Sequence, residues 1–382
     1  MAESIKLIQI RCPNCQSTLS RADRFETQVK CPYCTAAIDV ARVPQKPQYL
    51  VAPEHIILFQ TSEKDFERAV CNFLLHHQNA DNAVGECDGK KAYDNQFMMQ
   101  KARQYIPGDI LDKVEMNHAT AMYLPMFLYE GVFEAAYTCS LEKIKPDAGD
   151  YYDEDGFELI IQSHRGTVRG DYAFLCLAYE GQEIVHELSE LTMTFPYDPA
   201  QTEQFKPEHV RGTGCQILPH NLGRKETWHK RGMEKMTALA EREAKNQHPE
   251  HMMSCFKPVF SYAAKHAGRL VMAPFWMVCY DYNDKKYFVM MDGLGKYVHG
   301  SQPPQDKKLT KEVEKWETFG DRSKLFAVCM GMLVCLFNYW AGIVVIGVVW
   351  FGLPRLTARI KDGVIETAYR SRIKAYNRIV CN

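Results

Sequence analysis

The sequence predicts an α+β protein with an N-terminal four-cysteine zinc ribbon, a β-rich body and a C-terminal membrane helix or helical hairpin. Two Cys-Pro-x-Cys pairs predict the ribbon, mixed strand and helix patterns predict the body, and a long uncharged run predicts the membrane segment. The 382 residues then divide as follows: 1–42 zinc ribbon, 43–52 linker, 53–120 helical segment, 121–306 α+β body with duplicated β-hairpins, 307–324 charged linker, 325–353 membrane segment, 354–382 basic amphipathic tail.

The two cysteine pairs predict one structural Zn²⁺. Cys12 and Cys15 are separated from Cys31 and Cys34 by fifteen residues, a spacing that lets four thiolates converge in a tetrahedron. Four cysteine ligands leave no open position for water, so the metal is not expected to be catalytic. Gln16 and Thr35 stand where glycine often follows the second cysteine, which predicts a slightly strained turn at each pair. A redox dithiol pair, or thiols that merely pack, are the alternatives.

The ribbon does not have the charge of a nucleic-acid-binding module. Residues 1–40 carry five basic and four acidic side chains, and phosphate binding needs clustered positive charge. Only Phe25 and Tyr33 are available there to stack on bases. Protein contact is therefore the expected role. The ten other cysteines show no paired spacing and the N-terminus has no signal-peptide pattern, so we expect them to be reduced.

The segment after the linker begins with an amphipathic helix. Phe66, Val70, Phe73 and Leu74 recur on one helical face, and the Ser62 hydroxyl can cap the helix. His76, His77 and Cys87 could be imagined as a second metal site, but a helix end with imidazoles near the dipole explains them better.

The sequence of the body, residues 121–306, predicts β-hairpins with a helix between them. Residues 122–138 predict two aromatic strands about a turn at Glu130 and Gly131, and residues 273–298 predict a similar hairpin with its turn at 283–286. The two suggest a duplicated β unit. A strand pair (156–168 and 172–179) and a polar helix (228–245) are expected between them.

Catalytic motifs are absent from the sequence. It contains no GxSxG, HExxH or phosphate-binding GxxxxGK(S/T) pattern, and the acidic stretch 150–156 lacks the ligand order of an EF-hand. We therefore expect a protein that is not an enzyme.

The apolar run Leu325–Leu353 exceeds the roughly 20 residues that a membrane-spanning helix needs. A polar and aromatic stretch, 338–342, interrupts it, and lysines and arginines flank it on both sides. Because positive flanks stay in the cytoplasm, a re-entrant hairpin is favoured over a single span, and a buried helix pair is the remaining alternative.

The tail predicts a basic amphipathic helix. Ile365, Tyr369, Ile373, Tyr376 and Val380 share one stripe. Lipid headgroups are the expected contacts of five cations: Arg355, Arg359, Arg370, Lys374 and Arg378. Packing of this helix on the protein's own body or in an oligomer is equally open.

Several longer motifs resemble one protein family. YLPMFLYEG at Tyr123, RGDYAF at Arg169, FPYD at Phe195 and the stretch 273–300 are similar to motifs of the bacterial membrane-anchored zinc-ribbon proteins, often labelled TFIIB-type zinc ribbon or primosomal/helicase-like proteins. PEHIILF at Pro53 and IPGDIL at Ile106 fall in the family's order, while 126–127 and Asp292 depart from its pattern. The missing phosphate-binding loop contradicts the helicase label.

The resemblance implies a role at the bacterial inner membrane, with the bulk of the chain cytoplasmic. It implies a non-enzymatic, membrane-anchored adaptor that recruits PspA-like (ESCRT-III-related) or flotillin-like proteins, or a paralogous zinc-ribbon protein, in envelope stress. An oligomer is compatible with this role. The alternative is a membrane-tethered, zinc-ribbon nucleic-acid-binding regulator.

Overall fold

The computed structural model describes residues 4–76, 106–114, 119–146, 157–261, 268–316, 318–319, 322 and 339–380. Two compact units divide the chain: the first contains residues 1–60, 120–276 and 292–294, and the second contains residues 61–119, 277–291 and 295–382. Both units mix helices and strands, so the protein is of the α+β class. His77, Cys87 and the acidic stretch 150–156 lie outside the described residues.

The first unit begins with two small antiparallel sheets. In one, β1 (Ser4–Arg11) lies between β2 (Thr18–Arg21) and β5 (Lys46–Val51); in the other, β3 (Gln28–Lys30) pairs with β4 (Ala37–Asp39), which a 3₁₀ turn (Val40–Arg42) follows. We call residues 4–51 the four-cysteine ribbon. The predicted linker at 43–52 is wrong, because it contains β5. Pro47 does not prevent pairing, since β5 is an edge strand and an edge tolerates a missing N–H.

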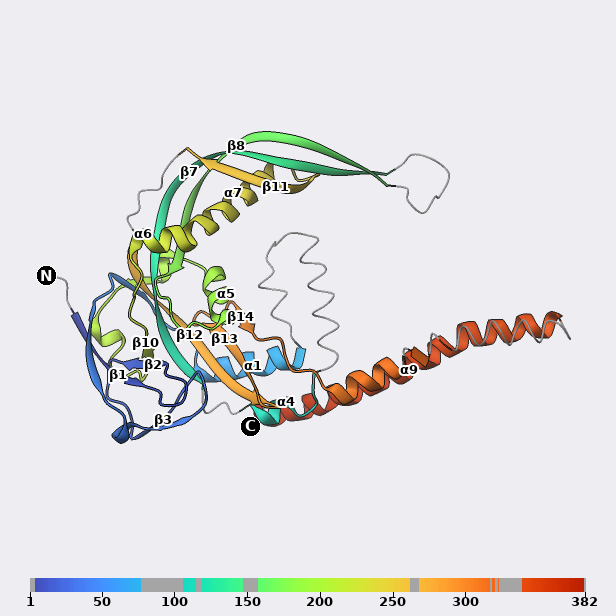
Figure 1. Ribbon diagram of the computed structural model, residues 1–382, viewed down its shortest axis with the longest axis horizontal. Coiled ribbons are helices and arrows are strands. Elements are labelled where there is room, and N and C mark those ends of the chain that lie inside the picture. The colour runs from blue at the N-terminus through green and yellow to red at the C-terminus, as the bar shows by residue number, and fades with distance from the viewer. Residues whose placement is uncertain are drawn as a thin grey trace. The chain divides into compact units, whose positions relative to one another are not determined.

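The centre of the first unit is a bent β ribbon. β7 (Thr120–Pro146) pairs antiparallel with β8 (Phe157–Leu177), and β11 (Met252–Phe260) lies along β7. Figure 1 shows these strands as an arch with α7 (Met233–Gln247) along its inner side. Met236, Ala240 and Ala244 of α7 belong to one buried cluster with the inward side chains of the arch. Burial of this shared apolar face holds helix and strands together.

The predicted turn at Glu130 and Gly131 is wrong, because β7 runs straight through both residues. Gly131 lies directly opposite Tyr172 in β8, and a Cβ on Gly131 would lie 3.0 Å from the Tyr172 hydroxyl. Two further glycine–aromatic pairs follow the same rule: Tyr137 with Gly166, and Phe133 with Gly170. These glycines leave room for rings that lie across the neighbouring strand, so they mark cross-strand packing instead of a turn.

The predicted duplication is also wrong, since residues 122–138 form no hairpin of their own. The two expected strands 156–168 and 172–179 are one continuous strand, β8, from Phe157 to Leu177. By contrast, the hairpin of β12 (Arg269–Tyr282) and β13 (Lys285–Asp292) is confirmed. Asn283 and Asp284 form its two-residue turn with φ of 51° and 60°, as tight hairpins require.

Shorter elements complete the first unit. β10 (Gln216–Ile217) pairs parallel with β7, β6 (His55–Ile57) pairs parallel with β12, and β9 (Thr202–Gln204) pairs with β6. The helical elements are α5 (His186–Thr194), two 3₁₀ turns (Pro199–Gln201 and Pro207–His209), α6 (Arg224–Thr227) and a π-helical turn (Trp228–Gly232) that leads into α7. The predicted helix at 228–245 is thus confirmed, with α6 extending it towards the N-terminus.

The second unit holds α1 (Glu63–His76), α4 (Ile110–Lys113), most of β13, β14 (Val298–Gly300) and α9 (Tyr339–Val380). The helical face predicted for α1 is confirmed, because all four of its apolar side chains are buried. Ser62 caps this helix as expected: its hydroxyl accepts a hydrogen bond from the Asp65 N–H, and the Asp65 carboxylate accepts one from the Ser62 N–H.

The tail forms the second half of α9. Ile365 and Ala368 pack against Leu309 and Val313 of the helix over 307–316, a segment predicted as a linker. Arg372 is buried and donates a hydrogen bond to the Ile106 carbonyl. One face of the predicted basic amphipathic helix therefore packs on its own unit, which is one of the alternatives that the sequence left open.

The predicted membrane segment is described only from residue 339 onwards, where it forms the first part of α9; residues 325–338 lie outside the described part. Among the helices that the structure describes, none is both long enough and apolar enough to cross a membrane.

Candidate metal centre

The four cysteines of the two Cys-Pro-x-Cys pairs converge. Their sulfur atoms all lie within 4.8 Å of one another. Cys12 Sγ is 3.6 Å from Cys34 Sγ, and Cys15 Sγ is 3.6 Å from Cys31 Sγ. Four sulfurs around a tetrahedral metal with bonds of about 2.3 Å are separated by roughly 3.8 Å, so these side chains fit such an ion. No other cluster of this kind occurs in the described ranges.

The two cysteine pairs share one backbone conformation. The Gln16 N–H donates to the Cys12 carbonyl at 2.9 Å, and the Thr35 N–H donates to the Cys31 carbonyl at 2.9 Å. Both turns end in the left-handed region, with φ of 64° at Gln16 and 62° at Thr35. The strain expected at these two positions is confirmed, since side chains with a Cβ rarely adopt positive φ.

Burial and hydrogen bonds act in opposite directions on the cysteine thiols. Burial raises the pKa of the Cys12 and Cys31 thiols, against the opposing effect of backbone N–H groups that point at each sulfur. At Cys34 burial also acts upward, but hydrogen bonds from the Asn14 side chain and the Ala36 N–H outweigh it and lower the pKa to about 7. A metal that binds here displaces protons from at least two thiols.

The apolar face of the ribbon is part of the core of the first unit. Leu7 and Leu50 are buried in one cluster with Ile56, Tyr123 and Phe205 of the body. The metal centre therefore sits on a module that is docked on its unit instead of hanging free.

Buried polar contacts fix the same interface. Tyr33, which is 6% exposed, accepts a hydrogen bond on its hydroxyl from Gln216 Nε2 at 2.8 Å. Glu183, only 4% exposed, accepts from the Thr18 N–H at 2.7 Å and from the Tyr179 hydroxyl at 2.8 Å. Each contact satisfies a polar group that burial would otherwise leave unpaired. Glu183 and Gln216 lie far from the cysteines in the sequence, and no local pattern reveals them.

This docking corrects one expectation. Phe25 and Tyr33 were predicted to be available for stacking on bases, but both are buried, and Arg21 lies over the Phe25 ring at 5.2 Å. Neither buried ring is accessible for stacking on bases.

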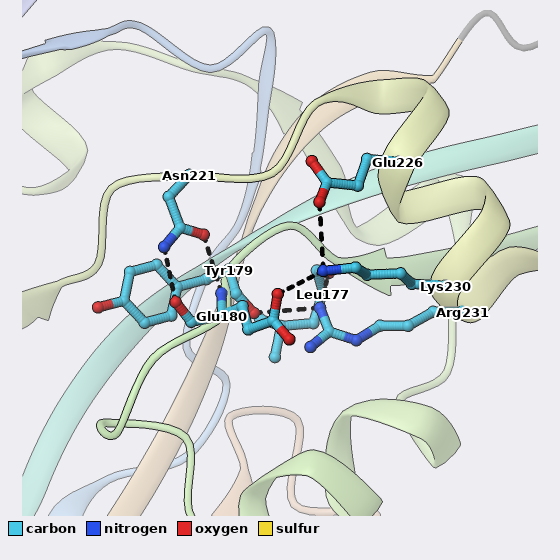
Figure 2. Close-up of polar contacts among 7 residues, drawn as sticks. All are labelled: Leu177, Tyr179, Glu180, Asn221, Glu226, Lys230 and Arg231. Carbon is cyan, nitrogen blue, oxygen red and sulfur yellow. Dashed lines mark hydrogen bonds and ion pairs between the residues drawn. The ribbon is translucent and has the colours of Figure 1, made fainter.

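The segment that carries Glu183 is itself held by a polar network at the end of β8. Figure 2 shows its members: Leu177, Tyr179, Glu180, Asn221, Glu226, Lys230 and Arg231. Lys230 forms an ion pair with Glu180 at 2.5 Å, and Asn221 both accepts from and donates to the Glu180 backbone, at 2.8 Å and 2.6 Å. Arg231 donates to the Tyr179 carbonyl at 3.1 Å. These contacts hold the segment after β8, which carries Glu183, against the π-helical turn and the residues just before α6.

The five cations predicted to contact lipid are all exposed on α9: Arg355, Arg359, Arg370, Lys374 and Arg378. Two of them have acidic partners, since Arg370 pairs with Glu366 at 2.7 Å and Arg378 pairs with Asp112 at 3.3 Å. Surface pairs of this kind are weak and leave the cations available to other anions.

Comparison with known proteins gives no relative: no family model, no curated protein and no solved structure matches the chain. The metal centre and its docked ribbon are therefore interpreted from their own chemistry.

Proposed function

We propose that the chain is a non-enzymatic, membrane-anchored adaptor whose four-cysteine ribbon holds one structural Zn²⁺. The convergence of four cysteine sulfurs within 4.8 Å, on a module docked into the core of the first unit, is the observation that carries this proposal. Tetrahedral sites made only of cysteine suit zinc and fix a fold, because no position remains for a substrate or water. The ion would stabilise the surface of the ribbon for contact with another protein.

The membrane anchor in this proposal is the apolar run 325–353. Its length exceeds what one span requires, and α9 continues from residue 339 into the cationic tail without a break. With basic residues on both sides of the run, a re-entrant hairpin keeps both flanks in the cytoplasm. The exposed arginines and Lys374 on α9 would then lie where anionic headgroups attract cations.

Protein partners fit the ribbon better than nucleic acid does. Both aromatic rings of residues 1–42 that could stack on bases are buried. The partner classes that the family resemblance implies are PspA-like, flotillin-like or paralogous zinc-ribbon proteins at the bacterial inner membrane.

Affinity capture of the full-length protein from native membranes tests this function. We would compare the native chain with Cys12→Ser/Cys15→Ser and with Cys255→Ser, an exposed cysteine outside the cluster. Recovery of a PspA-like or flotillin-like protein with the native chain and Cys255→Ser, but not with the double variant, supports the adaptor. Recovery of nucleic acid, or of no protein partner, overturns it.

The anchor is tested in the same membranes. The native chain should stay in the pellet after an alkaline carbonate wash, and deletion of residues 325–353 should release it. A native chain that washes off contradicts the membrane part of the proposal.

A further inference from the structure

In the described part of the chain, no strand pairs with the outer edge of β5. β5 is the last strand in the order β2-β1-β5, and Pro47 lies opposite Ile8 of β1. Because proline has no N–H, its neighbours along β5 make the backbone hydrogen bonds to β1. Backbone N–H groups alternate in direction along an antiparallel strand, so every second residue counted from Pro47 points its N–H away from β1. The N–H groups of Tyr49 and Val51 therefore point away from β1, towards the open edge.

Two large apolar side chains stand exposed on this strand. Tyr49 is 67% exposed and Val51 is 55% exposed, whereas Leu50 between them is buried in the core of the unit. An exposed edge with apolar side chains is a template for another strand, and proteins usually protect such edges. Here only Pro47 and Lys46 offer that protection, and both lie at the beginning of the strand.

All charged side chains on the three-stranded sheet β2-β1-β5 are positive. The strands β1, β2 and β5 carry four charged residues, all of them basic, and no acidic residue. Lys6 lies directly opposite Tyr49 in the sheet, and Lys46 begins β5. Lys6, Lys46 and Arg11 are exposed. A strand that pairs with β5 would therefore lie next to Lys46 and one strand away from Lys6, with no acidic residue on the sheet.

We propose that the open edge of β5 binds an extended, acidic segment of a partner protein by strand addition. This proposal rests on the adaptor function above and names the chemistry of its partner. Main-chain hydrogen bonds to the outward groups of Tyr49 and Val51 would give affinity, and carboxylates near Lys46 and within reach of the long Lys6 side chain would give preference for acidic sequences. A polypeptide fits better than a nucleic acid, since only a peptide backbone pairs with a strand edge, and Tyr49 is the only exposed aromatic ring among the described residues of the ribbon.

The test separates the backbone edge from the side chain of Tyr49. The zinc-loaded full-length protein in detergent would be used to select binders from a phage library of random ten-residue peptides. Fluorescence anisotropy would then compare one selected peptide on the native protein, on Tyr49→Pro and on Tyr49→Ala. Both variants lose the ring, but only proline removes the outward N–H. Pro47 shows that the ladder to β1 tolerates this change.

Strand addition predicts peptides enriched in Asp and Glu, and binding that is about five- to tenfold weaker on Tyr49→Pro than on Tyr49→Ala, the effect of one lost hydrogen bond. Binding should also weaken with salt and in Lys6→Gln/Lys46→Gln. Equal binding of the two Tyr49 variants, or selected peptides without acidic enrichment, overturns the proposal. Competition by a twenty-nucleotide oligothymidine at equal concentration also overturns it, in favour of nucleic acid.

Two controls distinguish a failure of strand addition at β5 from a failure of the proposed adaptor function. Tyr49→Pro should retain one zinc per chain, which shows that the ribbon is folded. If Tyr49→Pro still captures the membrane partner and Cys12→Ser/Cys15→Ser does not, the adaptor stands and strand addition at β5 is refuted. If the partner is captured by neither the native chain nor any variant, the adaptor itself is refuted.

Discussion

Removal of the metal should unfold one part of the ribbon and spare another. The perturbation is Cys31→Ser/Cys34→Ser, which takes two of the four sulfurs from the cluster. The stretch from Cys12 to Asp39 has only two strands of three residues and one of four. Besides the metal, it is held by the pairing of β2 with β1 and by the contacts of Thr18 and Tyr33 with the body. β1 and β5 instead share a core with the body, through Ile5, Leu7 and Leu50.

The magnitudes support local unfolding. Five buried aliphatic or phenyl side chains belong to the metal-bound stretch and its following turn: Leu19, Phe25, Val29, Ile38 and Val40. Together they contribute roughly 8–15 kcal/mol, at about 1.5–3 kcal/mol each. Structural zinc contributes about 10–16 kcal/mol in small modules near neutral pH. Loss of the metal thus removes about as much stabilisation as this whole apolar set provides, and the stretch should not stay ordered without it.

Hydrogen–deuterium exchange by mass spectrometry measures the effect segment by segment. In the double variant, peptides from residues 12–39 should lose protection by several orders of magnitude, while peptides from 4–9 and 46–51 should keep most of theirs. Native protein treated with a chelator should behave in the same way, and Cys255→Ser should match the native protein. Unchanged protection of 12–39 without metal would refute the reasoning. Loss of protection throughout residues 4–51 would show that β1 and β5 also depend on the ion.

Three further predictions concern strain, packing and charge. Gln16→Gly should raise the free energy of unfolding by about 1 kcal/mol relative to Gln16→Ala in urea titrations, because only glycine relieves the φ of 64°; equal stability of the two variants would contradict the strain. Gly166→Ala should cost about 1–3 kcal/mol, since its Cβ would lie 2.6 Å from the Tyr137 hydroxyl, and should cost much less in a Tyr137→Leu background; an equal cost in both backgrounds would rule out this clash. Burial lowers the pKa of Lys235 from 10.5 to about 8, so the unfolded chain binds more protons between these values and the free energy of unfolding should rise with pH across them, by up to roughly 3 kcal/mol. Lys235→Met should lack this rise when urea midpoints at pH 7.5 and pH 10 are compared, and a rise of the same size in the variant would assign it to other groups.

The metal centre, α1 and the β12–β13 hairpin could be predicted from the sequence because each is determined by short-range chemistry. Two Cys-Pro-x-Cys turns bring sulfurs together within a few residues, and only the pairing of the two turns needs the fold. The Ser62 cap and the apolar face of α1 follow from helical spacing. Asn283 and Asp284 tolerate the positive φ that a two-residue hairpin turn imposes.

The arch and the docking of the ribbon were decided by the tertiary structure. Gly131 reads as a turn in the sequence, but Tyr172, distant in the chain, lies across it and makes it the middle of a strand. The segment with Pro47 reads as a linker until β1 supplies a partner edge. No sequence pattern around Glu183 predicts its role, because that role is to accept a hydrogen bond from the Thr18 N–H across the interface between the ribbon and the body. Features that depend on neighbours along the chain were predictable from the sequence. Cross-strand pairs and buried polar contacts depend on residues that only folding brings together, so only the structure could assign them.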